Sequence, residues 1–101
     1  MKKGYDIIGK NFRSYWGEID LIAYESSSKT VVFVEVKLRK KKNLVNPLES
    51  IGRKKIEKIK KTALYFLQKR FVDYEAIRFD VIGITEENGK YEIEHVEDAF
   101  Q

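Results

Sequence analysis

The chain has 101 residues, 43% of them hydrophobic and 36% charged, with 20 Lys and Arg against 16 Asp and Glu and a formal net charge of +4. This composition predicts one folded domain over residues 1–101 rather than a disordered chain. Without cysteine, a signal peptide or an apolar run long enough to span a membrane, we expect a cytoplasmic protein with no disulfides and no membrane partner. His95 is the only histidine, which argues against a zinc site.

The first half of the chain predicts three strands. Apolar residues mixed with polar ones over residues 5–15 predict an edge strand or hairpin arm, and Trp16-Gly17 predicts a tight turn. A second strand is expected from about Glu18 to Tyr24, followed by a polar connection short enough for a hairpin. The third strand, from about Thr30 to Arg39, has the strongest β-signal because it is rich in valine.

The second half predicts a basic helix and two further strands. We expect residues 40–46 to form a basic loop and Pro47 to open a helix, because proline favours the first helical turn, although Gly52 weakens the start of that helix. The apolar positions at helical spacing are Leu48, Ile51, Ile56, Ile59, Ala63, Phe66 and Leu67, and the opposite face carries Arg53, Lys54, Lys58, Lys61 and Lys69. Strands are then expected over about residues 76–84 and 90–96, joined by a turn.

The positive charge is concentrated in one segment. Residues 37–70 hold 13 Lys and Arg against two acids, whereas the rest of the chain is net acidic. Such segregation is typical of proteins that bind polyanions, and the alternative of a solvated helix face beside a basic loop is about equally supported by charge alone. The candidate nucleic-acid-binding residues are Arg39, Lys40, Lys41, Lys42, Arg53, Lys54, Lys55 and Lys58.

Three charged residues interrupt the two most apolar strands. Asp20 lies within residues 17–23, and Glu35 and Lys37 lie within residues 31–37. Burying a charge in a sheet is costly unless the charge is paired or holds a metal. If the two strands pair antiparallel, Asp20 and Glu35 converge, although the sequence does not determine the register.

Two converging carboxylates predict a site for a hard cation, Mg²⁺ or Mn²⁺, with Glu18 as a candidate third ligand. Such an ion acidifies a bound water and polarises phosphorus, and Lys37 would orient the water or stabilise the developing charge. The alternative is a structural ion-pair cluster on a partly exposed sheet face, which the spacing alone favours somewhat.

The segments GEIDLIA at 17–23, VFVEVK at 32–37 and RFDVI at 78–82 together resemble the YraN-like family, and residues 5–13 and 95–100 also fit it. That family is similar to Holliday-junction resolvases and restriction endonucleases of the PD-(D/E)xK superfamily. The resemblance implies an α/β, restriction-endonuclease-like fold with a central mixed β-sheet flanked by helices. It also implies catalytic roles for Asp20, Glu35 and Lys37, with Ile19 in place of the motif's proline.

The function implied by the resemblance is Mg²⁺- or Mn²⁺-dependent cleavage of DNA, with branched DNA as one candidate substrate and a homodimer as one candidate assembly. The first alternative is a non-catalytic nucleic-acid-binding module that retains the nuclease fold. The second alternative is an assembly protein whose charged face contacts an acidic partner.

Members of the family usually begin with a helix before the segment that matches Tyr5, and this chain starts without one. A misassigned start, a trimmed chain and a natural truncation are the three explanations. We expect the missing helix to leave apolar sheet surface uncovered, which favours pairing with another chain, and to remove one candidate metal-binding acid.

Several residues outside the motif carry separate expectations. Asp80 is expected to make a structural hydrogen bond or ion pair rather than to bind a metal, and His95 is expected to be structural. Trp16 fits either the core or a nucleic-acid contact. The aromatic residues expected in the core are Tyr65, Phe66 and Phe71.

Overall fold

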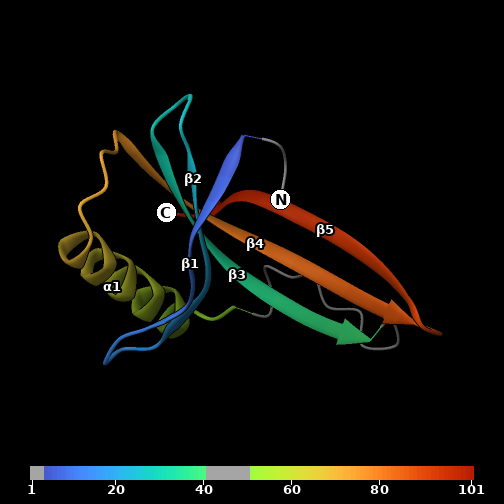
Figure 1. Ribbon diagram of the computed structural model, residues 1–101. Helices are drawn as coiled ribbons and strands as arrows, with labels where there is room; N and C mark the ends of the chain where they lie inside the picture. The colour runs from blue at the N-terminus through green and yellow to red at the C-terminus, as the bar shows by residue number, and fades with distance from the viewer. Residues whose placement is uncertain (1–3, 41–50) are drawn as a thin grey trace.

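The computed structural model describes residues 4–40 and 51–101. The elements, in chain order, are β1 (Tyr5–Arg13), β2 (Glu18–Glu25), β3 (Thr30–Lys40), α1 (Arg53–Lys69), β4 (Ala76–Glu87) and β5 (Lys90–Phe100). The strands form one sheet in the order β1-β2-β3-β4-β5, with β3 and β4 parallel and the other neighbours antiparallel (Figure 1). The expected α/β class with a mixed sheet is therefore confirmed, with one helix in the described part of the chain.

The crossover that contains α1 makes the parallel pairing possible. Tight turns suffice for the antiparallel neighbours, and Asn88 and Gly89 between β4 and β5 have the positive φ angles, 51° and 76°, that a two-residue hairpin turn requires. Two parallel strands need a longer return path, which a helix commonly supplies. In Figure 1, α1 lies against one face of the sheet, and the far ends of β3, β4 and β5 extend beyond it.

The main core lies between α1 and the sheet. Alternation along β3 directs Val31 and Phe33 towards α1, where Phe33 stacks on Phe79 at 5.5 Å between ring centroids and meets Phe66 edge-on at 6.1 Å. Each aromatic pair adds about 0.5–1.5 kcal/mol beyond the apolar area it buries. These contacts fix α1 over β3 and so determine which helix residues face the end of that strand.

The opposite face of the sheet buries a polar network around Asp80, whose side chain is fully buried. Its carboxylate accepts hydrogen bonds from Arg78 Nε at 2.8 Å, Arg78 Nη2 at 2.9 Å and the Asp98 backbone N–H at 3.0 Å, and lies 2.7 Å from His95 Nε2. Burial raises the pKa of Asp80, but these hydrogen bonds outweigh it and hold the pKa below its ordinary value. The structural ion pair predicted for Asp80 is confirmed.

The helix begins later than expected. Gly52 is the N-cap in an extended conformation, α1 begins at Arg53, and Ile51 is not helical; Pro47 and Leu48 lie outside the described residues, as does the expected loop over 41–46. Glycine disfavours helix interiors, so the helix starts after it. The prediction that the helix already includes Ile51 and Gly52 is therefore wrong.

Two further expectations differ from the structure. Phe71 is fully exposed rather than in the core, because α1 ends at Lys69, whereas Phe66 is buried and Tyr65 half-buried. β4 and β5 are also longer than expected, and β5 continues to Phe100. The hydrogen bond from the Asp98 backbone to Asp80 holds the end of β5 against β4.

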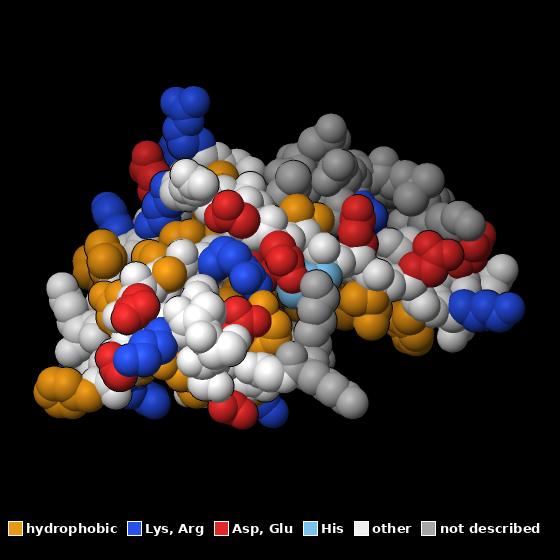
Figure 2. Space-filling model, turned by 90° about the horizontal axis from the view of Figure 1, so that it is seen from above, with side chains coloured by type: hydrophobic (Ala, Val, Ile, Leu, Met, Phe, Trp, Pro, Cys, Tyr) orange, Lys and Arg blue, Asp and Glu red, His pale blue; other side chains and the backbone are white. Residues whose placement is uncertain are grey.

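The part of the sheet beyond α1 leaves large apolar side chains exposed. Leu38 pairs with Ile84 and Ile84 pairs with Ile93, so the three side chains share one face, and Leu38 and Ile93 are each 71% exposed. Figure 2 shows hydrophobic side chains at this end of the molecule among charges of both signs. Leu38 and Ile93 thus leave apolar surface exposed on this part of the sheet. In the described part of the chain, no helix is long and apolar enough to cross a membrane.

Candidate active site

Asp20 lies in β2 at the point where pairing with β3 ends. The ladder runs from Glu25 opposite Thr30 to Leu21 opposite Val34. The next residue of β2 is Asp20, and its Oδ2 accepts a hydrogen bond from the Val36 backbone N–H at 2.7 Å. The carboxylate thus takes the place of a backbone partner. The predicted antiparallel pairing is confirmed, and it holds Asp20 beside the carboxyl half of β3.

Glu35 is the second acid of the site and is only 8% exposed. Its Oε1 lies 3.0 Å from Nζ of Lys55, which reaches down from α1. Burial raises the pKa of Glu35, Lys55 acts in the opposite direction, and the charge of Asp20 raises the pKa further, so the net shift is upwards from the ordinary value of 4.5. A buried carboxylate next to another carboxylate is stabilised in its charged form by a bound cation.

The two lysines next to Glu35, Lys37 and Lys55, have pKa values that are shifted in opposite directions. A hydrogen bond with Lys55 lowers the pKa of Lys37, and burial lowers it further, although the carboxylates of Glu35 and Asp20 oppose the shift. Burial also lowers the pKa of Lys55, but hydrogen bonds with Lys37 and Glu35 outweigh it and raise the pKa overall. Lys55 therefore holds its proton more strongly than an ordinary lysine, whereas Lys37 releases its proton more easily.

Glu18, the candidate third ligand, points to a different partner. Its Oε2 lies 3.5 Å from Arg13 Nε, and both side chains are substantially exposed. Across residues 4–40 and 51–101, no group of three or more acidic or histidine side chains gathers closely enough to hold a metal ion. Asp20 and Glu35 are the two remaining candidate metal ligands. Their carboxylates fit Mg²⁺ or Mn²⁺, since such ions are held by one or two carboxylates together with water and substrate phosphate.

Part of the predicted basic surface lies next to this cluster. A depression of about 420 Å³ is lined by Trp16, Gly17, Glu18, Lys54, Lys55, Lys58 and Ile59. Arg53, which precedes Lys54 in the first turn of α1, is also exposed. The depression thus joins the basic face of α1 to the β1–β2 turn, and Lys55 connects it to Glu35.

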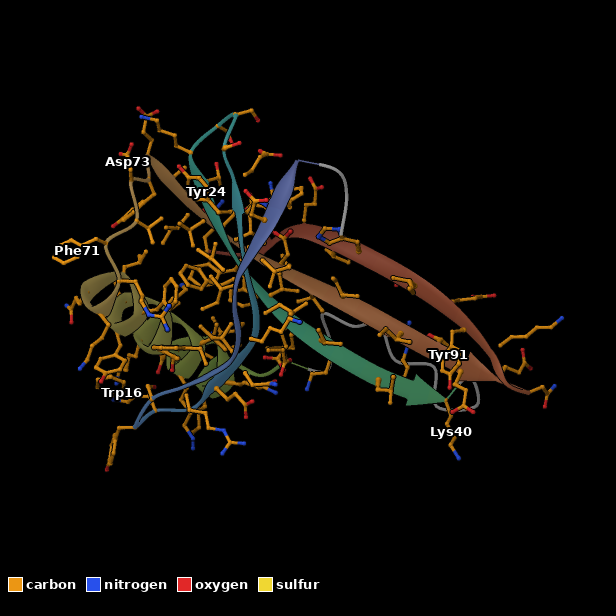
Figure 3. The ribbon with its side chains drawn as sticks, viewed as in Figure 1. Trp16, Tyr24, Lys40, Phe71, Asp73 and Tyr91 are labelled. Atoms are coloured by element: carbon orange, nitrogen blue, oxygen red, sulfur yellow. The ribbon has the colours of Figure 1, made fainter. Side chains whose placement is uncertain are left out.

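The remaining candidate nucleic-acid-binding residues are not part of the depression. Arg39 donates from Nε to Thr85 Oγ1 at 3.0 Å, and its Nη2 lies 3.7 Å from Glu94, so its guanidinium contacts β4 and β5. Lys40 is exposed at the end of β3, far from Trp16 (Figure 3). Lys41 and Lys42 lie outside the described residues.

The ion pair between Lys55 and Glu35 was not anticipated from the sequence. Lys55 precedes the buried Ile59 by one helical turn, so the two share a helix face, and this spacing was the available signal that Lys55 faces the sheet. Which sheet residue it meets depends on how α1 docks over β3, and no local spacing rule reports that.

Comparison with known proteins identifies the family. A family model described as "Uncharacterised protein family UPF0102" matches residues 1–84. The chain belongs to the UPF0102 family. Similar UPF0102 proteins include those of Syntrophomonas wolfei, 38% identical over 99 residues that cover 98% of this chain and 84% of the relative, and Persephonella marina, 43% identical over 97 residues that cover 96% and 78%.

A UPF0102 protein of Sulfurihydrogenibium sp. is also 43% identical over 97 residues, which cover 96% of this chain and 79% of the relative. The predicted YraN-like family membership is thus confirmed. The region matched by the UPF0102 model includes β1, β2, β3 and α1, and therefore all four residues of the cluster formed by Asp20, Glu35, Lys37 and Lys55.

Proposed function

We propose that this UPF0102 protein is a Mg²⁺- or Mn²⁺-dependent nuclease that hydrolyses phosphodiester bonds in DNA. The observation that carries the proposal is the nearly buried Glu35, which has Asp20 on one side and both Lys37 and Lys55 within hydrogen-bonding or electrostatic reach. The five-stranded mixed sheet with α1 on one face supports the restriction-endonuclease-like fold that the residues at 17–23 and 32–37 led us to expect.

Each residue of the cluster has a distinct role in this proposal. Asp20 and Glu35 would hold the cation, which when bound supplies an acidified water and positive charge at the phosphate. Lys37 would orient the attacking water at Nζ or stabilise the negative charge that develops on the phosphate. Lys55 orients Glu35 through their ion pair and adds positive charge where negative charge develops on the phosphate.

The exposed basic residues of α1 would hold the DNA backbone. Arg53, Lys54 and Lys58 lie at the start of the helix, and two of them line the depression beside the acids. Lysines that contact phosphates position a duplex without reading its bases. A symmetric dimer would present two such sites for paired cuts, so a four-way junction is the first branched substrate to test.

Cleavage assays with active-site variants test the proposal. A four-way junction and a linear duplex are incubated with Mg²⁺ or Mn²⁺, and we expect Asp20→Asn, Glu35→Gln and Lys37→Met each to slow cleavage by about 100-fold or more. Glu92→Gln in β5, an exposed carboxylate away from the cluster, should retain the wild-type rate. Cleavage that is unchanged in Asp20→Asn and Lys37→Met would exclude this active site.

A second candidate is a nucleic-acid-binding module without catalysis. Lys55 already neutralises Glu35, and the described residues provide no third metal ligand, so the cluster could serve as a folded ion-pair network. Calorimetric titration of Mg²⁺ separates the two candidates, because binding that is lost in both Asp20→Asn and Glu35→Gln requires a carboxylate metal site. Salt-dependent DNA binding that is indifferent to Mg²⁺, with no cleavage, would favour the module.

A further inference from the structure

The turn between β1 and β2 presents two aromatic side chains at the edge of the depression. Tyr15 is 96% exposed and Trp16 38% exposed, and their rings meet edge-to-face with centroids 6.0 Å apart. Figure 3 shows Trp16 at the end of this hairpin, beside α1. Two adjacent exposed aromatic rings next to a basic depression are the components of a base-stacking site.

The turn is anchored, so the exposure of Tyr15 follows from a defined geometry. The Ser14 backbone N–H donates to the Gly17 carbonyl at 2.7 Å, and the Trp16 N–H donates to Ser14 Oγ at 3.1 Å. Ser14 Oγ also lies 2.7 Å from Oγ1 of Thr62, a fully buried residue of α1. The turn is thereby fastened to the helix that carries the basic residues.

The depression extends from Trp16 to Lys55, the lysine that pairs with Glu35. Trp16 forms one part of its lining and makes an edge-on contact with Tyr65 at 6.3 Å between centroids. Lys54 and Lys58 form the basic side, and Lys55, also in the lining, bonds to Glu35. A strand lying in the depression would therefore meet the ring of Trp16 and the ammonium groups of Lys54 and Lys58, and Lys55 would connect it to Glu35.

We infer that Tyr15 and Trp16 form a stacking platform for an unpaired base of a DNA strand whose phosphates contact Lys54 and Lys58. The inference rests on the proposed function and specifies its substrate as DNA that has a single-stranded or opened segment at the site. Every base has a π-face, so stacking of this kind tolerates any sequence, while the lysines follow the backbone. The bases of an intact duplex are stacked on one another and cannot reach the platform.

Trp16 supplies a direct measurement, because it is the only tryptophan in the chain. Its fluorescence is recorded while single-stranded oligo(dT), a blunt duplex of equal length or a forked duplex is added in the presence of EDTA, which prevents cleavage. We expect quenching by oligo(dT) and by the fork but not by the blunt duplex. Tyr15→Ala should weaken binding of oligo(dT) about tenfold and leave duplex affinity within about twofold.

Two variants control for the integrity of the fold and for general loss of aromatic surface. Tyr15→Phe retains a ring and should bind oligo(dT) as the wild type does. Tyr91→Ala removes another exposed tyrosine, 62% exposed and at the other end of the molecule, and should bind oligo(dT) as the wild type does (Figure 3).

The outcomes separate this inference from the proposed function. Oligo(dT) and duplex binding with no change in Trp16 fluorescence, and with Tyr15→Ala equal to the wild type, would overturn the stacking platform and leave the nuclease proposal in place. Failure of the wild type to bind oligo(dT), fork and duplex at low salt would overturn both.

Discussion

Glu35 and Asp80 are both buried acids, but their surroundings shift their pKa values in opposite directions. The carboxylate of Asp80 accepts hydrogen bonds from Arg78 and a backbone N–H, and these donors satisfy it within the protein. Glu35 is paired with Lys55 and also faces the charge of Asp20. A carboxylate next to another negative charge is stabilised by a bound cation, whereas a carboxylate with all its hydrogen-bond partners inside the protein is not, so the proposed metal site is at Glu35 rather than at Asp80.

Asp80→Asn should lower the free energy of unfolding by about 3 kcal/mol, because it removes the fully buried carboxylate that pairs with the half-buried guanidinium of Arg78. The lowered pKa of Asp80 means that its contribution is present above the ordinary value of 3.8 and is lost as the pH falls through the folded-state pKa. Urea titrations at neutral and acidic pH measure both effects. The exposed pair of Asp73 with Lys29 is the control, and Asp73→Asn should change stability by less than about 1 kcal/mol.

Glu35→Gln should keep the free energy of unfolding at pH 7 or raise it by about 1 kcal/mol, and under the proposed function it should also abolish Mg²⁺ binding. The raised pKa of Glu35 means that the wild type loses stability as the pH rises from the ordinary value of 4.5 through the folded-state pKa. Glutamine removes this loss, so the thermal midpoints of variant and wild type should converge below about pH 4.5. A variant that is markedly less stable than the wild type at pH 7 would mean that the ion pair with Lys55 outweighs the cost of burial.

At the scale of elements, the contact between the β1–β2 turn and α1 should be measurable as a coupling energy. Ser14→Ala and Thr62→Val each remove one side of the 2.7 Å contact between their hydroxyl groups and should each cost about 1 kcal/mol. The double variant should cost less than the sum of the two single variants, because both lose the same contact. Each hydroxyl also has a separate partner, the Trp16 N–H for Ser14 and the Lys58 carbonyl for Thr62, and the loss of those bonds adds. Unfolding free energies that simply add would show that the turn and the helix are independent.

The strands of this fold could be predicted from the sequence because their signals are local. Alternation along β2 and β3 and the short connection between Glu25 and Thr30 predicted the antiparallel pair, and the register that brings Asp20 and Glu35 together came from the structure. The start of α1, the exposure of Phe71 and the pairing of Lys55 could not be predicted, since each depends on how α1 ends and docks on the sheet. The candidate cluster of Asp20, Glu35 and Lys37 was therefore predicted from its strands, whereas Lys55 was predicted only as a nucleic-acid-binding residue and not as the partner of Glu35.

At the scale of the whole molecule, the basic segment over residues 37–70 is divided by the fold. Lys54 and Lys58 face the depression, whereas the guanidinium of Arg39 contacts β4 and β5. Among these three described residues, only Lys54 and Lys58 lie beside Lys55 in the depression, where under the proposed function they would release counterions from DNA. The number of basic residues in this segment is thus an upper limit on the number of phosphate contacts.

Lys54→Gln and Lys58→Gln should each reduce the salt dependence of DNA binding by about one unit of slope in a plot of log affinity against log salt. Titrations of one duplex between about 50 and 200 mM salt measure this slope. Lys90→Gln, at the turn between β4 and β5, is the matched control and should leave the slope unchanged. Equal effects of all three substitutions would indicate diffuse attraction rather than a defined interface.

The parallel pairing of β3 with β4 has a consequence for the order of folding. Its partners, such as Val34 and Asp80, are far apart in the sequence, whereas the antiparallel neighbours are joined by short turns. Closing the long connection reduces chain entropy before its contacts compensate, so we expect the β1–β2–β3 unit and the β4–β5 hairpin to form first and the α1 crossover to join them last. Asp20 and Glu35 meet within the first unit, while Lys55 arrives with the helix. During folding, the site therefore acquires Asp20, Glu35 and Lys37 before Lys55, the lysine that forms the ion pair with Glu35.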